Sequence, residues 1–398
     1  MIVARPSELA GIAQEQAGDL VDLGPGQPDP SLLPFGLVRR HLDRALARYG
    51  AGALAYGANA GPLPAREALA AWASETEDGD FRAEQVLVVA GATQGIDLIC
   101  TRMARPGDAA LVQRTTYNLA LELFRGRGIE AVPVGDDLAA PTGEDLVRAA
   151  SEVTSRGKRV AFAYVVPTCH NPTGVSLTAG QRLDLLGGAR EAGILIVEDD
   201  PYRVLSFGDR PAPTIAALAG EDGVVAVRTF SKLCGPGLRL GFLIGEEGWI
   251  DDFSVDPLFR SGGGIAHLAS LVLPTLLSSP AFVRHVARLR DELEERCRAL
   301  RAALAPAAAC GAAAWRDPAG GLFLWVSLRP PATAGSVVER AAVRGVRILP
   351  GKHWFAEAGG ESSTWLRISF SGYSADVLAD AGARIAEAIV EAYRGADA

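Results

Sequence analysis

Four apolar runs in this sequence each lead into polar residues of a different chemical kind. They are VLVVA before Gly91, Ala92 and Thr93; AFAYVVP before Asn171; ILIVE before Asp199 and Tyr202; and VVAVRTF before Ser231 and Lys232. In an open α/β sheet, ligands bind outside the carboxyl ends of the strands. The pattern therefore predicts that these side chains meet at one edge of a sheet and hold one ligand.

The turn at residues 91–93 and the side chain of Arg239 are both suited to a phosphate group. The turn lies between a predicted strand and a predicted helix, where free N–H groups and the helix dipole attract an anion. Arg239 could grip the same phosphate with its planar fork, beside the hydroxyl groups of Thr229 and Ser231. A tight turn with a capping threonine explains residues 91–93 about equally well, so this signal is weak by itself.

Lys232 and Asp199 could carry the covalent and the electrostatic part of a reaction. A lysine with a lowered pKa forms a Schiff base with a carbonyl group. A carboxylate opposite a pyridine nitrogen keeps that nitrogen protonated, and the phenol of Tyr202 could reach a ring hydroxyl. An isolated lysine would simply be surface charge, and the acids at 198–200 could end a solvated strand or bind a metal. No histidine cluster or zinc spacing accompanies them, so we expect no metal site.

Three further residues could serve the same site. Asn171, displayed on a loop by Pro172, could donate its amide to a phenolic oxygen, although Asn-Pro also occurs in ordinary turns. Tyr117 could stack on a ring or belong to the core. Arg367, within WLRISFS, could bind a carboxylate bidentately or be a surface residue of a strand. Together with the phosphate turn and the lysine, these residues point to pyridoxal 5′-phosphate (PLP).

Strands and helices must alternate to bring these residues together. Between about residues 85 and 245, short apolar runs such as GFLIG alternate with segments of helical period. This is typical of parallel strands with crossover helices in a three-layer α/β domain, so we predict a mostly parallel sheet. One helix is expected to end at Gly193. A long amphipathic helix is expected at 281–306, with Arg296 on its solvated side.

The second half of the chain has a different pattern. Strands are expected at 321–328, 346–351 and 365–371, with a final helix after them. The first 45 residues are too few for a core of their own. We therefore predict a large PLP-binding domain over 46–280 and a smaller α+β domain formed by 1–45 and 281–398.

Composition excludes several classes of function. The 398 residues are 48% hydrophobic and 22% charged, which is ordinary for a globular protein of about two domains. A net charge of −8 argues against nucleic acid or an anionic membrane as the main partner. No apolar run is long enough to span a membrane, and the N-terminus lacks the apolar core of a signal peptide. The five cysteines form no CxxC pair, so we expect reduced thiols in the cytoplasm.

Taken together, the motifs resemble the class I and II aminotransferases of PLP fold type I. The resemblance runs in family order from GQPDP at 26–30 to RISFS at 367–371, and it includes LAYGANAGPLPAREALA (54–70), NPTG and an SFSK-like string. It is strongest to the 2-aminoadipate and kynurenine aminotransferase-like group and to the effector domain of MocR-type regulators. Those regulators carry an N-terminal DNA-binding domain, which we do not expect here.

The resemblance implies a role for each residue around the cofactor ring. Lys232 would form the internal aldimine with PLP and later shuttle the proton. Asp199 would pair with the pyridine nitrogen, and Tyr202 and Asn171 would hydrogen-bond the phenolic oxygen. Tyr117 would stack on the ring.

The resemblance also implies how phosphate and substrate are held. The residues around the phosphate would be Gly91, Ala92, Thr93, Thr229, Ser231 and Arg239. Tyr56 would reach the phosphate of the neighbouring subunit, which implies a homodimer with shared active sites. Arg367 would hold the substrate carboxylate, with Asn171 and Gly26 beside it.

The implied reaction moves an amino group between an α-amino acid and a 2-oxo acid. A PLP-dependent lyase, cyclase or oxidase stays open, because the same residues stabilise the carbanion that all these reactions share. A ligand-sensing protein without turnover is a further alternative. The run Arg260-Ser-Gly-Gly-Gly at 260–264 departs from the family where neighbouring subunits often contribute to the site. It leaves substrate specificity and the subunit contact open.

Overall fold

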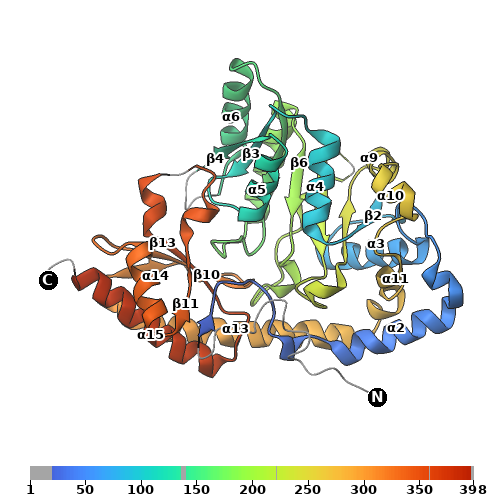
Figure 1. Cartoon of the computed structure of the whole chain (residues 1–398). Coiled ribbons are helices and arrows are strands. Elements are labelled where there is room, and N and C mark those ends of the chain that lie inside the picture. Colours follow the sequence, from blue (N-terminus) through green and yellow to red (C-terminus); the bar gives the residue numbers. More distant parts are fainter. Residues whose placement is uncertain (1–19, 136–139, 221, 358, 396–398) are drawn as a thin grey trace.

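A seven-stranded sheet forms the centre of the molecule, in the strand order β2-β8-β7-β6-β5-β3-β4 (Figure 1). The structure is a computed structural model that describes residues 20–135, 140–220, 222–357 and 359–395. The strands of this sheet are β2 (Val86–Val89), β3 (Ala109–Gln113), β4 (Glu130–Val134), β5 (Val160–Val165), β6 (Ile196–Asp199), β7 (Val224–Thr229) and β8 (Gly241–Ile244).

The sheet is mostly parallel, as predicted, and β8 is the exception. Strand β8 pairs antiparallel with both β2 and β7, whereas the other neighbouring strands pair in parallel. Residues 230–240, which join β7 to β8, contain only a three-residue 3-10 helix. A parallel return needs a crossover of a dozen or more residues, usually a helix, so this short connection reverses the chain instead. The interpretation of GFLIG as one more parallel strand was therefore wrong.

Helices cover both faces of the sheet, because its strands carry apolar side chains on both sides. In β2, Val86 and Val88 join one buried cluster, whereas Leu87 and Val89 join another. The helices of this part of the chain are α3 (Leu63–Glu77), α4 (Ala92–Met103), α5 (Asn118–Gly126), α6 (Gly143–Ser155), α7 (Ala179–Ala192), α8 (Ile215–Ala219), α9 (Glu247–Ser254), α10 (Pro257–Gly262), α11 (His267–Ser270) and α12 (Leu273–Leu276). Helix α7 ends at Gly193, whose φ of 64° is left-handed, as the sequence predicted.

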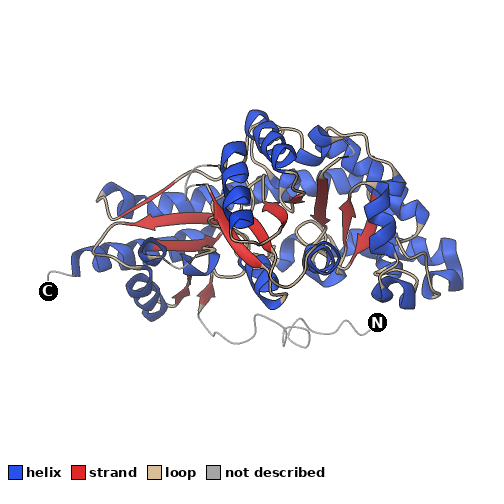
Figure 2. Ribbon diagram, turned by 90° about the horizontal axis from the view of Figure 1, so that it is seen from above, coloured by secondary structure: helices blue, strands red, loops and turns tan. Residues whose placement is uncertain are grey.

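A second, antiparallel sheet has the strand order β12-β13-β10-β9 and lies beside the first (Figure 2). Its elements and the helices packed with it are α13 (Pro280–Ala309), β9 (Ala313–Trp315), β10 (Phe323–Leu328), α14 (Ala334–Val343), β12 (Leu349–Pro350), β13 (Trp365–Ser369) and α15 (Ala375–Arg394). The single strand expected at 346–351 is divided between two sheets. Its first half, β11 (Val346–Arg347), pairs in parallel with β1 (Val21–Asp22), and its second half is β12.

The long helix α13 runs along the base of the molecule (Figure 1). Arg296 of this helix is buried, with 3% of its surface exposed, which contradicts the prediction of a solvated position. Its guanidinium donates hydrogen bonds to the Asp29 carboxylate and the Ser371 carbonyl oxygen, both at 3.0 Å. Periodicity could not reveal this partner, because Asp29 lies far away in the sequence and reaches the helix only in the fold.

The described part of the N-terminal segment contacts elements of both halves of the molecule, the one around the seven-stranded sheet and the one around the four-stranded sheet. Strand β1 joins β11, whereas α2 (Phe35–Tyr49) packs against α12. Residues 1–19 of the predicted small domain lie outside the described residues. The division into domains at residues 45 and 280 therefore stays a prediction.

Candidate active site

A cleft of about 440 Å³ opens at the carboxyl edge of the seven-stranded sheet, where the second sheet faces it. Of the residues predicted from the sequence, all line this cleft except Gly91 and Tyr56. Those in the lining are Gly26, Ala92, Thr93, Tyr117, Asn171, Asp199, Tyr202, Thr229, Ser231, Lys232, Arg239 and Arg367. The ends of β2, β5, β6 and β7 thus converge as expected, and β13 closes the cleft from the other side.

Lys232 has an environment that favours its neutral amine. Its Nζ donates a hydrogen bond of 2.6 Å to the carbonyl oxygen of Gly26. Burial lowers the pKa of Lys232 to about 8, and the cations Arg367 and Arg239 act in the same direction, against the opposing charge of Asp199. A lysine of this kind can act as a nucleophile near neutral pH.

Asp199 is a buried carboxylate with one oxygen left over. The hydroxyl group of Tyr164 donates a hydrogen bond of 2.5 Å to Oδ2, whereas Oδ1 has no partner among the described residues. Burial raises the pKa of Asp199 to about 6. A buried carboxylate oxygen without a partner costs free energy, so the site fits a ligand that brings a cationic N–H group to it. Tyr164 was not among the predicted site residues, although its hydroxyl stands out in the otherwise apolar run AFAYVV.

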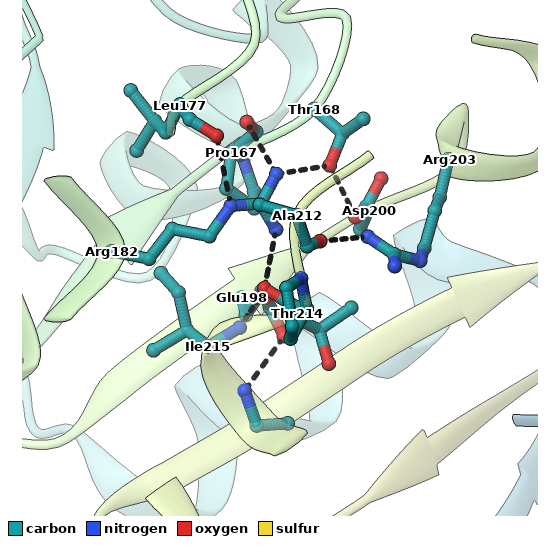
Figure 3. Close-up of polar contacts among 12 residues, drawn as sticks. Pro167, Thr168, Leu177, Arg182, Glu198, Asp200, Arg203, Ala212, Thr214 and Ile215 are labelled. Carbon is teal, nitrogen blue, oxygen red and sulfur yellow. Dashed lines mark hydrogen bonds and ion pairs between the residues drawn. The ribbon is translucent and has the colours of Figure 1, made fainter. Parts of the chain in front are cut away.

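The two acids beside Asp199 belong to a buried ionic network (Figure 3). Glu198 accepts hydrogen bonds from Arg228 at 2.8 Å and from the backbone N–H of Ile215 at 2.7 Å. Asp200 accepts one from Thr168 at 2.6 Å, and Arg182 donates to the same threonine at 2.9 Å. The network ties the end of β6 to the loop after β5. Neither acid is therefore a solvated strand end, which was one reading of the sequence.

Removing the cation at the centre of this network is expected to destabilise the fold. In Arg228→Met, the buried carboxylates of Glu77 and Glu198 both lose their ion pairs with Arg228, which lie at 2.7 and 2.8 Å. We expect a loss of about 3–5 kcal/mol in the free energy of unfolding, measured by urea denaturation. The control is Arg148→Met, since Arg148 is exposed and the ion pair that it forms in the described part of the chain is with Asp145, a neighbour on its own helix. Equal shifts in the two variants would contradict the prediction.

The start of α4 and the end of β7 form a cradle for an anion. Gly91 caps α4 with φ of 86°, and a Cβ there would lie 3.0 Å from Nη2 of Arg239. Arg239 is held by a hydrogen bond of 2.8 Å to the carbonyl oxygen of Ala90. The hydroxyl groups of Thr229 and Ser231 are 3.0 Å apart beside it. Gly91 does not line the cleft, but its missing side chain leaves the arginine room next to the helix N-terminus.

Arg367 is a buried guanidinium whose hydrogen-bond partners carry no charge. It donates 3.1 Å and 2.6 Å hydrogen bonds to the amide oxygen of Asn171 and the carbonyl oxygen of Gly24. Its Cζ lies over the rings of Phe323 and Trp354, at 3.9 and 4.0 Å from their centroids. Burial lowers the pKa of Arg367 to about 9. A cation held in this way is a site for a carboxylate.

Tyr56 lies apart from the cleft of its own chain and is 84% exposed. The segment that carries it packs against the glycine run at 262–264. A Cβ at Gly263 would lie 2.4 Å from the carbonyl oxygen of Gly57, and one at Gly264 would lie 2.3 Å from that of Ala58. The glycines at 263 and 264 are therefore explained by close backbone approach.

Comparisons with known proteins agree with this geometry. The family described as aminotransferase class I and II matches residues 19–385. The chain is 30% identical over 381 residues to 2-aminoadipate transaminase of Thermus thermophilus, covering 94% of this chain and 91% of that protein. It is 28% identical over 377 residues to aromatic-amino-acid aminotransferase 1 of Thermococcus litoralis, covering 94% and 89%. The structure of Pyrococcus horikoshii kynurenine aminotransferase, in complex with PMP, superposes with a TM-score of 0.85 and 29% identity over 98% of this chain and 95% of that one.

The chain belongs to the class I and II aminotransferases. Its fold is that of the fold type I enzymes, and its cofactor is pyridoxal 5′-phosphate. The aminotransferase cleft fits this cofactor on three observations already described, namely the unpartnered oxygen of Asp199, the cradle at Gly91 and Arg239, and the amine of Lys232. None of the described helices of this aminotransferase is both long and apolar enough to cross a membrane.

Proposed function

We propose that Lys232, Asp199 and Arg367 carry amino-group transfer between an α-amino acid and a 2-oxo acid. The observation that carries the proposal is that the three side chains lie around one cleft. Each of them also lacks a proton or a partner that a ligand could supply or replace. Lys232 has a lowered pKa. Among the described residues, one oxygen of Asp199 has no partner and Arg367 has no anionic hydrogen-bond partner. An amino acid and the cofactor together supply the groups that these three side chains lack.

The geometry divides the work between the two sides of the cleft. The cofactor, when bound, supplies a carbonyl group and an electron-withdrawing ring. Arg367 would orient the substrate through its carboxylate, and Tyr117 would pack on the ring. Nζ of Lys232, released from the carbonyl oxygen of Gly26, would take the proton from the substrate Cα and carry it to the carbon atom that the cofactor supplies. Asn171 and Tyr202 would hold the phenolic oxygen, so that the ring keeps one orientation.

Titration of the PLP-loaded protein with amino acids, followed by visible absorption, tests this function. We expect glutamate or an aromatic amino acid to convert the cofactor to pyridoxamine phosphate, with one 2-oxo acid formed per site. A 2-oxo acid added afterwards should restore the original spectrum. Ammonia release without pyridoxamine phosphate would instead indicate the lyase alternative, and no spectral change with any donor would favour the ligand-sensing alternative.

The lowered pKa of Lys232 predicts how cofactor uptake depends on pH. Only the neutral amine attacks the carbonyl, so the rate at which cofactor-free protein takes up PLP should rise about tenfold per pH unit below pH 8. Above that pH it should level off. Pyridoxamine phosphate has no carbonyl group and serves as the control, since its uptake should not follow this profile. A midpoint near the usual lysine value of about 10.4 would contradict the assignment.

We also propose a cytoplasmic homodimer in which the partner's Tyr56 completes the phosphate site. The exposed apolar side chains that neighbour Tyr56 in the sequence support it, since Leu54 and Leu63 are 76% and 47% exposed. Such a concentration of exposed large apolar residues is typical of an interface. Sedimentation equilibrium should give twice the mass of one chain, and a monomer that retains full activity would refute the shared site. Cytoplasmic residence is supported by the five free cysteines.

A further inference from the structure

Tyr164 carries a hydroxyl group into an apolar cluster of the seven-stranded sheet. It lies on β5, is fully buried, and belongs to the same cluster as Phe124, Phe162 and Val197. Its ring meets that of Phe124 edge-on, with centroids 5.5 Å apart and an interplanar angle of 77°. Tyr164 is not among the described residues that line the cleft. Packing therefore fixes the ring, and the hydroxyl group can act on a ligand only through a neighbouring side chain.

The register of the sheet brings this hydroxyl group to Asp199. Tyr164 of β5 is paired with Val197 of β6. Asp199, two residues further along β6, has its side chain on the same face of the sheet as Val197. The hydroxyl group donates its hydrogen bond of 2.5 Å to Oδ2 of Asp199. Burial and the charge of Asp199 raise the pKa of Tyr164 well above its usual value, so the phenol stays protonated and remains the donor.

This hydrogen bond leaves one oxygen and the negative charge of Asp199 for a ligand. Asp199 lines the cleft, and its Oδ1 has no partner among the described residues. Tyr164 is a neutral donor, and the buried cation Arg228 is already paired with Glu77 and Glu198. A cationic donor in the place of Tyr164 would compensate the carboxylate itself and weaken its attraction for a protonated ring nitrogen. The phenol therefore stabilises the carboxylate without neutralising it.

We propose that Tyr164 is a positioning residue for the cofactor. Its hydroxyl group occupies Oδ2 of Asp199, so that Oδ1 remains for the N–H group of the pyridine ring and the ring nitrogen stays protonated. This role rests on the proposed function, which makes Asp199 part of the cofactor site. If the hydrogen bond only satisfied two buried polar groups, its loss would affect every ligand of this shape equally.

A comparison of PLP with an analogue that lacks the ring nitrogen tests this role. In 1-deaza-PLP a C–H group replaces the nitrogen, whereas the aldehyde and the phosphate are kept. Tyr164→Phe removes the hydroxyl group alone, and we expect it to raise the dissociation constant of PLP at pH 7 about 10-fold in equilibrium dialysis. The analogue should bind the variant no more weakly than the wild type, because its ring does not use the charge of Asp199. A loss of equal size for both compounds would overturn the role.

The matched control is another tyrosine that loses its hydroxyl group. Tyr393 lies on α15, outside the described lining of the cleft. Tyr393→Phe should bind PLP and 1-deaza-PLP as the wild type does. A weaker affinity for PLP alone in Tyr164→Phe, with Tyr393→Phe unchanged, is the expected result.

The pH dependence of PLP affinity gives a second readout. The pKa of Asp199 is about 6, because burial raises it and the hydrogen bond from Tyr164 lowers it. A ring N–H group requires the carboxylate form, so the affinity of the wild type should fall below about pH 6. Without the hydroxyl group the pKa of Asp199 rises, and the midpoint for Tyr164→Phe should lie at least about one pH unit higher. The other charged or titratable groups around Asp199 are the same in both proteins, namely Arg228, Asp200, Lys232, Tyr117 and Tyr202. An unchanged midpoint would overturn the role.

Asp199→Ala separates the role of Tyr164 from the proposed function. We expect Asp199→Ala to weaken PLP binding, and Tyr164→Phe to have no further effect when it is added, because no carboxylate remains for the hydroxyl group to hold. If Asp199→Ala binds PLP as the wild type does, the part of Asp199 in the proposed function fails, and the role of Tyr164 fails with it. If Asp199→Ala binds weakly and Tyr164→Phe binds normally, only the role of Tyr164 is overturned.

Discussion

Lys232→Ala is expected to lower kcat/KM for amino-group transfer by at least about 10³-fold. The residue contributes twice, as the nucleophile that holds the cofactor and as the base that moves the proton, and general acid–base catalysis alone contributes about 10²–10⁴-fold. No other described amine lines the cleft, so nothing replaces Nζ. The measurement is the single-turnover rate of pyridoxamine phosphate formation with a good amino donor.

Two controls show whether the loss is chemical. Lys158→Ala removes a surface lysine that pairs with Glu130, and it should keep full activity. In Lys232→Ala, added methylamine should restore part of the rate, because the space left by the side chain admits a small amine. If Lys232→Ala retains more than about a tenth of the wild-type rate, Lys232 is not the base that we assign.

The sequence predicted the parts of this site that are local. Asp199 ends one apolar strand, Asn171 and Lys232 follow two others, and parallel strands bring their carboxyl ends to one edge. Glycine, proline and the alternation of apolar residues predict turns and strands from the sequence, because each acts on the backbone of its own segment. This is why the residues predicted at the ends of β5, β6 and β7 lie together in one cleft.

The parts of the site that were not predicted depend on contacts between distant segments. Phe323 and Trp354 enclose Arg367 only because β10 and the turn after β12 flank β13 in the fold. An aromatic residue in an apolar run looks like core material whether or not a guanidinium lies against it. The same holds for Arg296, whose charge seemed solvated until Asp29 was placed beside it. Motifs and periodicity within one segment cannot predict contacts between residues that lie far apart in the sequence.

Arg367→Met is expected to reduce kcat/KM for amino acids by about 10²–10³-fold, mostly through KM. The side chain would hold the substrate carboxylate by two charge-assisted hydrogen bonds, each contributing about 1.5–3 kcal/mol. Methionine has a similar length and no charge, so the packing between Phe323 and Trp354 is largely kept. Visible absorption of bound PLP should be unchanged, which shows that the cofactor site is intact. The prediction is refuted if KM rises less than about threefold.

The rings around Arg367 help to keep its guanidinium charged and in place. Burial opposes the charge, whereas the oxygens of Asn171 and Gly24 and the faces of Phe323 and Trp354 favour the cation. Trp354→Leu should therefore raise KM for amino acids about 10-fold, and Trp354→Phe clearly less, because phenylalanine keeps an aromatic face. Amines without a carboxylate supply the decisive comparison, since their reaction with the cofactor should be the same in Trp354→Leu and in the wild type. A loss of equal size for both kinds of amine would show that Trp354 supports the fold of the cleft rather than the charge of Arg367.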